Sequence, residues 1–335
     1  MNLSVLMSVF NGDSYLDCAI QSILNQTYKD FDFLIINNGS IDQTESILNH
    51  YAKVDNRINI IKNSKNIPLI EARHQGILVS NAEWVALMDA DDYAYPQRLE
   101  RQMKFLKKEG SKIGALGTYA YYMNQKNEII GVMKTGPTTE NEFNHRLYQN
   151  EAIVIIDPSA IIHRQRYLDI GGYRSEYTPA GDLDLWYRLC EYGKQVRTLP
   201  EFLMLYRIHD QSVSCSKTIF QRMKTHFSND NMRRRRKSLK ERTYPEFQAY
   251  INKKIFCRIK WFISDNGMTY FKRAGNLFGK GKYPAFFFYL IISLILKPSY
   301  LFSKFLPQIK FHIFSKFGFK KTIDRFHNFK QMRRE

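Results

Sequence analysis

Cysteine is scarce in this chain of 335 residues, and the spacing of its four cysteines excludes two classes of protein. Cys18, Cys190, Cys215 and Cys257 are scattered and form no C-x-x-C pair. A disulfide-stapled secreted domain and a structural zinc site both need closely spaced cysteines, so neither fits this sequence. We therefore expect reduced thiols in a cytosolic protein.

Long apolar runs are also missing. The longest run, residues 283–296, ends at Lys297-Pro298 and is shorter than the roughly 20 residues that a membrane-spanning helix needs. The apolar run at residues 3–9 has no basic stretch before it and no small-residue cleavage site after it, so it does not resemble a secretory signal. We expect neither a signal peptide nor a transmembrane helix.

Acidic residues are rare in the C-terminal third of the chain. The whole chain has 50 Lys+Arg and 32 Asp+Glu, a formal net charge of +18. From Lys217 onward there are 28 basic and 6 acidic residues (28 − 6 = +22), whereas residues 1–215 carry 22 basic and 26 acidic residues (22 − 26 = −4). The composition, 44% hydrophobic and 14% aromatic, is sufficient for a buried core. These numbers predict two units, 1–215 and 216–335.

The first unit alternates between strand and helix patterns. Short runs rich in β-branched residues predict strands at 3–9, 31–36, 58–62, 84–88 and 202–206, and helical spacing predicts helices at 15–24, 42–53 and 69–80. This alternation favours an α/β fold with a mostly parallel sheet covered on both faces. Ligands bind such sheets at the carboxyl ends of the strands, so the loops at 10–13, 37–40 and 89–92 are the candidate site.

Asp89-Ala90-Asp91-Asp92 directly follows one of these predicted strands. Side chains at i and i+2 of an extended segment point the same way, so Asp89 and Asp91 can converge on one point. Carboxylates that converge repel one another unless a cation lies between them, and oxygen ligands are those that Mg²⁺ and Mn²⁺ prefer. The alternative is an acidic turn that caps the next helix. The position at the end of a strand favours the metal site.

Two further groups stand later in the first unit. Asp182 precedes a run with helical spacing, so its carboxylate is either a helix cap or a general base. His209 follows the last predicted strand, and it is a candidate third metal ligand only in the company of other ligands.

Residues 1 to about 214 resemble the family 2 glycosyltransferases. Eight short stretches carry the resemblance in the family's order: Ser4–Gly12 (SVLMSVFNG), Ile20–Tyr28 (IQSILNQTY), Asn38–Asp42 (NGSID), Glu71–Ile77 (EARHQGI), Leu87–Asp92 (LMDADD), Gly171–Tyr173 (GGY), Gly181–Trp186 (GDLDLW) and Tyr206–Asp210 (YRIHD). The resemblance implies a GT-A fold, in which two Rossmann-like halves share one sheet. It also implies transfer of a sugar from a nucleotide-sugar to an acceptor hydroxyl, with inversion at the anomeric carbon.

The resemblance also implies roles for individual residues. Asp89 and Asp91, with His209, fall at the divalent metal (Mn²⁺ or Mg²⁺) that binds the donor diphosphate, and Asp182 falls on the catalytic base. The nucleotide-sugar positions of the family correspond to Val9, Asn11, Asn38, Arg73, Asp89 and Asp92.

The sequence departs from the family at two positions. The family has an aspartate pair before Gly-Ser, the second of which accepts a hydrogen bond from the base; here the pair is Asn37-Asn38. An amide oxygen still accepts that bond without the help of a charge, so a UDP-sugar is favoured but not certain. Where the family often has glutamate before the catalytic aspartate, this chain has Gly181, so contacts on the acceptor side are expected to differ.

The second unit is basic, aromatic and mostly helical in pattern. Its densest charge is Arg233–Lys237, and the apolar runs 283–296 and 300–306 have the pattern of helices that lie on a membrane with lysines at the rim. We expect an anionic membrane surface as the partner. Packing against the first unit is the alternative, and nucleic-acid binding is a less favoured third one.

Together these observations predict a metal-dependent, inverting hexosyltransferase of cell-surface polysaccharide biosynthesis, bound peripherally to the cytoplasmic face of the cell membrane. Its acceptor would be a saccharide or a lipid-linked oligosaccharide. A sugar nucleotidyltransferase is the alternative enzyme, but the loop Phe10–Ser14 lacks the glycine-rich, cation-bearing sequence that such an enzyme needs. A non-catalytic basic surface-binding protein on a degenerate fold is the other alternative, and the three acidic positions Asp89, Asp91 and Asp182 argue against it.

Overall fold

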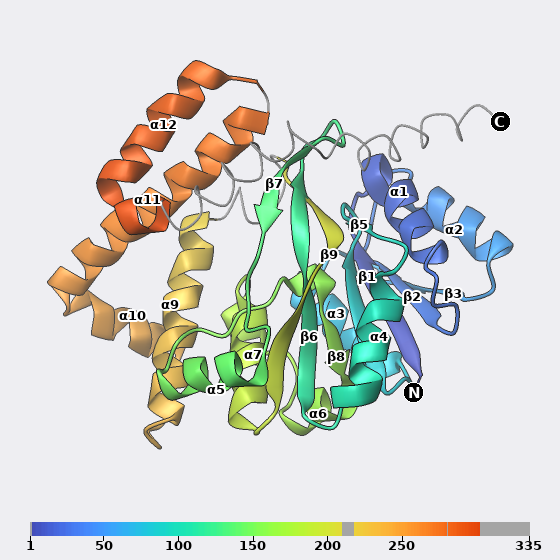
Figure 1. Ribbon diagram of the computed structural model, residues 1–335, viewed down its shortest axis with the longest axis horizontal. Helices are drawn as coiled ribbons and strands as arrows, with labels where there is room; N and C mark the ends of the chain where they lie inside the picture. The colour runs from blue at the N-terminus through green and yellow to red at the C-terminus, as the bar shows by residue number, and fades with distance from the viewer. Residues whose placement is uncertain (1, 210–217, 280, 302–335) are drawn as a thin grey trace.

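The structure is a computed structural model that describes residues 2–209, 218–279 and 281–301, shown in Figure 1. Its strands are β1 (Leu3–Val9), β2 (Asp32–Asn37), β3 (Ile58–Lys62), β4 (Trp84–Asp89), β5 (Tyr93–Ala94), β6 (Ile113–Met123), β7 (Ile129–Met133), β8 (Ile161–His163) and β9 (Gln195–Arg207). Its α-helices are α1 (Asp13–Leu24), α2 (Thr44–Val54), α3 (Leu69–Val79), α4 (Arg98–Glu109), α5 (Glu140–Tyr148), α6 (Arg164–Asp169), α7 (Gly181–Glu191), α9 (Thr218–Arg235), α10 (Tyr244–Asn252), α11 (Ile255–Gly279) and α12 (Tyr283–Leu296). Two short 3₁₀ helices are η1 (Asp157–Ser159) and η2 (Ser175–Tyr177).

The strands of the described residues form one nine-stranded sheet in the order β3-β2-β1-β4-β8-β6-β9-β5, with β7 paired to β6. In the N-terminal half, β1 runs parallel to both β2 and β4, and β2 runs parallel to β3. Ser8 of β1 pairs with Ile36 of β2 and with Asp89 of β4, so the carboxyl ends of the three strands lie at one level. The predicted convergence of the three loops is therefore confirmed.

The second half of the sheet is mixed. β8 runs antiparallel to β4 and β6, β5 runs antiparallel to β9, and β6 runs parallel to β9. This half extends the sheet beyond β4, and β9 brings the segment that carries His209 back toward the end of β4. The predicted α/β fold, with a parallel sheet in its first half, is confirmed.

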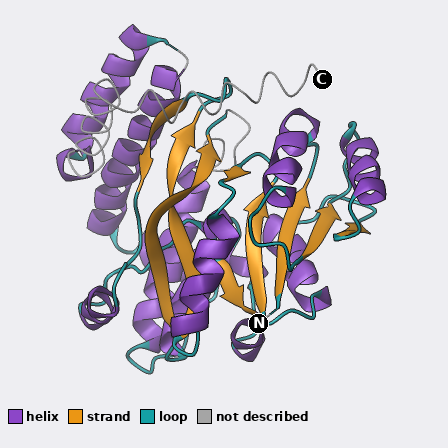
Figure 2. Cartoon of the chain, turned by 45° about the vertical axis from the view of Figure 1, so that its right-hand side comes forward, coloured by secondary structure: helices purple, strands orange, loops and turns teal. Residues whose placement is uncertain are grey.

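Helices cover both faces of the sheet (Figure 2). The alternation along β1 explains why, because Val5 and Met7 join the core that α1 and α4 cover, while Leu6 points to the other face and joins the core beneath α3 and α7. A parallel sheet that is apolar on both faces must be covered on both, as the sequence pattern predicted.

The C-terminal region is helical, as predicted, and α9 packs on α7. Asp184 of α7 is fully buried and pairs with Arg174, Arg188 and, at 3.6 Å, with Arg235 of α9. Arg235 also pairs with Glu241, at 2.9 Å. The cluster Arg233–Lys237 therefore lies partly in an interface with residues 1–215. The sequence alone favoured contact between this basic region and a membrane.

The remaining helices form a hairpin in which α11 and α12 pack against each other, at the upper left of Figure 1. Within the part of the chain that the structure describes, no helix combines the length and the apolar character needed to cross a bilayer. The predicted unit boundary at residue 215 and most of the predicted run 300–306 lie outside the described residues.

Candidate functional site

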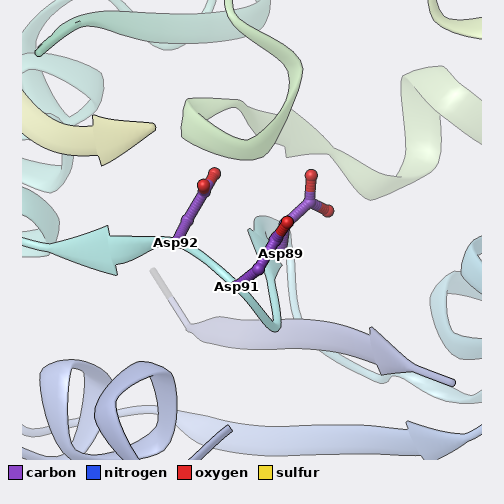
Figure 3. Close-up of side chains that lie close together, drawn as sticks. All are labelled: Asp89, Asp91 and Asp92. Carbon is purple, nitrogen blue, oxygen red and sulfur yellow. The ribbon is translucent and has the colours of Figure 1, made fainter. Parts of the chain in front are cut away.

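The three aspartates that follow β4 come together, as the sequence predicted. Ligand oxygens of Asp89, Asp91 and Asp92 all lie within 4.8 Å of one another. Figure 3 shows the three side chains on the same side of the loop that ends β4. Burial, with the nearby charge of Asp91, raises the pKa of Asp89 to about 6 and that of Asp92 well above its ordinary value. Carboxylates gathered this closely at a strand end are suited to a divalent cation.

Asp91 and Asp92 are held by residues at the end of β9. The Nε2 atom of His209 lies 2.7 Å from Oδ2 of Asp91, so the structure places His209 beside the aspartates. The backbone N–H of Arg207 donates to Oδ1 of Asp92 over 2.8 Å, and its Nε–H donates to the carbonyl of Asp91 over 2.7 Å. The Oδ2 atom of Asp92 is buried and has no hydrogen-bond partner among the residues that the structure describes.

Arg73, which the family resemblance assigns to the nucleotide, pairs with two carboxylates at the end of the sheet. It is 3% exposed, and its guanidinium donates to Asp89 over 2.5 Å and to Asp157 of η1. Burial by itself would lower its pKa, but the negative charges of Asp157 and Asp89 keep that pKa well above the ordinary value. A contact between Arg73 and a nucleotide stays a prediction; the observed role is to neutralise Asp89 and Asp157.

Asp157 was missed by the sequence reasoning. It lies in an Asp-Pro-Ser segment with no motif signal, and only the pairing of β8 with β4 brings η1 to the end of the sheet. Its Oδ1 atom is buried without a hydrogen-bond partner. A residue of this kind can be found only from contacts between segments that are distant in the sequence.

Asp182 lies in the first turn of α7 and is half-buried. Burial raises its pKa to about 7, and the negative charge of Asp157 acts in the same direction, while Arg73 opposes both. A carboxylate with a pKa near neutrality is a stronger proton acceptor than an ordinary aspartate. A Cβ atom at Gly181 would stand 2.9 Å from Cδ1 of Ile70 in α3, so a larger residue at this position would require the Ile70 side chain to shift.

The Asn38 amide is used completely within the protein. Its Nδ2 donates to Oδ1 of Asn66 over 2.9 Å and to the carbonyl of Ile67 over 2.7 Å. Its Oδ1 accepts from Nδ2 of Asn63 over 3.0 Å and from the N–H of Ile67 over 3.3 Å. An aspartate could accept these bonds but could not donate the other two, so the asparagine fixes the loop after β2 to residues 63–67. A base contact by Asn38 stays a prediction.

Val9 and Asn11 lie at the end of β1, next to this loop. The Val9 side chain is buried in the core, and its carbonyl accepts the N–H of Asn38 over 2.8 Å. Asn11 is exposed with a φ of 50°, and its Oδ1 accepts the N–H of Ile41 over 2.9 Å. Both residues join the loops after β1 and β2, and their contact with a nucleotide stays a prediction.

The fold and the site define a class of protein before any relative is considered: an α/β protein with an acidic cluster at the carboxyl end of a parallel sheet. Two solved structures share the fold. The mannosyltransferase PcManGT of Pyrobaculum calidifontis, solved with GDP-Man and Mn²⁺, has a TM-score of 0.53 at 12% identity over 88% of this chain and 75% of that one. TarS 1–349 of S. aureus, solved with UDP-GlcNAc, has a TM-score of 0.54 at 17% identity over 64% of this chain. This chain spans 61% of that TarS chain.

Sequence relatives identify the family. The family model described as Glycosyl transferase family 2 matches residues 4–170. The O-antigen biosynthesis glycosyltransferase WbnJ of Escherichia coli is 32% identical over 221 residues, which cover 64% of this chain and 82% of WbnJ. An uncharacterized glycosyltransferase of Haemophilus influenzae is 32% identical over 222 residues, which cover 63% of this chain and 67% of the relative. The chain belongs to glycosyltransferase family 2.

Proposed function

We propose that this protein is an inverting, divalent-metal-dependent hexosyltransferase that uses a nucleotide-sugar and acts in the synthesis of a cell-surface polysaccharide on the cytoplasmic side of the membrane. The observation that carries the proposal is the group formed by Asp89, Asp91 and Asp92 at the end of β4, with Asp182 linked to it electrostatically through Arg73 and Asp157.

The acidic group fits a divalent cation. Three carboxylates offer oxygen ligands within 4.8 Å of one another, and the buried Oδ2 of Asp92 has no hydrogen-bond partner within the described part of the chain. We assign Asp89 and Asp91 as ligands of Mn²⁺ or Mg²⁺, with His209 as a further ligand and Asp92 beside them. When bound, the cation supplies Lewis-acid neutralisation of the charge on the departing diphosphate.

Asp182 is assigned as the general base. The Asp182 carboxylate takes the proton of the acceptor hydroxyl as the acceptor oxygen forms its bond to the anomeric carbon of the sugar. The bond between that carbon and the diphosphate oxygen breaks, and the nucleoside diphosphate leaves with the electron pair. A single displacement of this kind inverts the anomeric carbon, and it needs a base whose pKa is near the working pH.

The choice of donor and acceptor rests on relatives. The Escherichia coli protein WfaP, 25% identical over 217 residues, is named a UDP-Glc:α-D-GlcNAc-diphosphoundecaprenol β-1,3-glucosyltransferase. TarS was solved with UDP-GlcNAc and PcManGT with GDP-Man. We favour a UDP-sugar donor, with Asn38 and Arg73 among the nucleotide contacts, and a saccharide or lipid-linked acceptor. Because Asn38 accepts hydrogen bonds from Asn63 and Ile67, the nucleobase of the donor would contact a loop whose conformation is already fixed.

The test combines binding with turnover. The full chain is mixed with Mn²⁺ and a panel of UDP-, GDP- and TDP-sugars, and the melting temperature of each mixture is measured, because a ligand of the folded state stabilises it. Turnover of the donor that stabilises the protein is then measured for wild type, Asp182→Asn and the control Asp55→Asn, whose carboxylate pairs with Arg57 after the end of α2. We expect Asp182→Asn to keep the thermal shift and lose about 10²–10⁴-fold in turnover, while Asp55→Asn keeps both.

Two results would contradict the proposal. If no nucleotide-sugar in the panel raises the melting temperature in the presence of Mn²⁺, the proposal that the protein uses such a donor is wrong. Turnover of Asp182→Asn equal to that of the wild type would assign Asp182 to helix capping instead.

A further inference from the structure

The helical hairpin formed by α11 and α12 carries large apolar side chains that are exposed in the part of the chain that the structure describes. On α11 the exposed apolar residues are Ile255, Phe256, Ile259, Phe262 and Ile263, and Phe256 is 85% exposed and Phe262 is 71% exposed. On α12 they are Phe287, Phe288, Ile291, Leu294 and Ile295, and Phe288 is 61% exposed and Ile295 is 74% exposed. We call these two sets the hairpin face. An apolar surface of this extent marks a contact with another molecule or with a membrane.

The spacing along each helix gathers its exposed apolar residues into one stripe. At 100° per residue, the five residues of α11 lie within one stripe, and those of α12 recur at intervals of three and four residues. The opposite side of α12 packs on α11, because Ser293 of α12 donates to the carbonyl of Gly267 in α11 over 2.8 Å and Tyr289 stacks on Tyr270. With 14 residues and a rise of about 1.5 Å each, α12 is about 21 Å long, less than the roughly 30 Å of a bilayer core. It can lie in a membrane surface but cannot span it.

The segment that carries the hairpin face is strongly basic. Residues 253–297 contain nine lysines and arginines and one acidic residue, Asp265, a net charge of +8 (9 − 1). Asp265 is buried in a pairing with Arg222 and His226 of α9, so its charge is neutralised within the protein. Arg258 and Lys260 of α11 are exposed and fall on either side of the apolar stripe on the helical wheel.

Arg235 and Arg236, in the middle of the cluster Arg233–Lys237, take part in an interface within the protein. Arg235 pairs with Glu191 at 2.5 Å and with Glu241 at 2.9 Å, and Nη1 of Arg236 donates to Asn150 over 2.9 Å. These side chains are 17% and 14% exposed. They join α9 to the first unit and are not available to a distant surface.

The positive charge of the hairpin indicates which kind of molecule binds the hairpin face. A second copy of this chain would bring a like-charged hairpin against it, and residues 302–335 of the same chain carry nine basic and two acidic residues. Both would add repulsion at the basic rim, whereas an anionic lipid surface attracts it. We infer that the hairpin face docks on an anionic membrane surface, with the apolar stripes of α11 and α12 in the headgroup region and Arg258 and Lys260 at the lipid phosphates.

The position of the hairpin in the molecule agrees with this role. In Figure 1, β1 rises from the N label toward the end of the molecule at which α11 and α12 stand. The aspartates at the carboxyl end of β4 therefore lie toward the same end, since β1 and β4 are parallel. The inference itself does not depend on the proposed transferase activity.

The experiment is vesicle flotation of the full chain. Vesicles of phosphatidylcholine alone and of phosphatidylcholine with one third phosphatidylglycerol are compared at about 0.05 M and 0.5 M NaCl. The apolar variant is Phe262→Gln with Phe288→Gln, and the matched control is Tyr148→Gln with Val54→Gln, two apolar residues of the first unit that are 83% and 64% exposed. Arg258→Gln with Lys260→Gln forms the charge variant. Circular dichroism and gel filtration check each variant for folding and association.

We expect the wild type and the control to float with the anionic vesicles. The apolar variant should bind at least about tenfold more weakly, because each Phe ring no longer leaves water. The charge variant should bind about tenfold or more weakly at low salt, and its binding should change less with added salt than that of the wild type.

Three results would overturn the inference. The first is wild-type protein that stays with the soluble fraction at low salt in the presence of anionic vesicles. The second is an apolar variant that floats as well as the control. The third is a wild-type dimer in gel filtration that becomes monomeric in the apolar variant without any flotation, which would assign the hairpin face to a second copy. Donor binding, measured by thermal shift, reads out the proposed function separately.

Discussion

Asp157→Asn tests whether the charge next to the proposed base sets the pH dependence of transfer. The substitution keeps the shape of the side chain and removes one negative charge that raises the pKa of Asp182. It also leaves Arg73, which lowers that pKa, with a single carboxylate partner in Asp89. Both changes act in the same direction and lower the pKa of Asp182. Asp157→Glu restores the charge.

The magnitude follows from the pKa of Asp182, about 7 in the folded protein. A general base works in its deprotonated form, so the wild-type rate rises as pH rises through the pKa. About a tenth of the protein is competent at pH 6 and about nine tenths at pH 8, a change in kcat/KM of about tenfold. If removing Asp157 lowers the pKa of Asp182 by about one unit, about half of the variant is competent at pH 6.

The assay is kcat/KM for transfer from pH 5.5 to 9 at saturating Mn²⁺, with each profile divided by its own plateau. The maximal kcat/KM of Asp157→Asn can be lower than that of the wild type, because Arg73 loses a partner. The acid limb of its pH profile should move to lower pH. Asp157→Glu and the control Asp55→Asn, whose carboxylate pairs with Arg57, should keep the wild-type limb. A wild-type profile that is flat between pH 6 and 8, or an unchanged limb in Asp157→Asn, would refute the reasoning.

Three further predictions concern the metal site, the loop after β2 and the interface between the two units. Asp91→Asn should lose the rise in melting temperature that Mn²⁺ gives the wild type, which corresponds to about 2.7 kcal/mol at a hundredfold excess over Kd, and an unchanged rise would exclude Asp91 as a ligand. Asn38→Asp should cost roughly 1–3 kcal/mol in urea unfolding, because the part-buried hydrogen bonds to Asn66 and Ile67 lose their donor, whereas the exposed Asn59→Asp should cost less than about 0.5 kcal/mol; equal costs would contradict the role of the amide. Asp184→Asn should cost about 3–5 kcal/mol because three arginines lose a buried partner, and a cost no greater than that of Asp55→Asn would show that the interface does not depend on this carboxylate.

Much of this protein could be predicted from the sequence because the relevant signals are local. Periods of two and of three to four residues place the elements of the first unit within a few residues, from β1 to α3. Side chains two residues apart in extended backbone point the same way. The convergence of the aspartates at the end of β4 therefore follows from local geometry. The charge difference between the two units is likewise a property of composition alone.

Tertiary structure decided what depends on segments that are far apart in the sequence. Asp157 has no local signal and reaches Arg73 only because β8 pairs with β4, and the pKa of Asp182 depends on the burial and the charge that this pairing creates. A run of arginines has the same composition in an interface as on a free surface, so only the fold could assign Arg235 to Glu191 and Glu241 and leave the apolar residues of α11 and α12 exposed. Burial and pairing are properties of the folded chain, because they depend on which side chains the sheet and helices bring within a few ångströms.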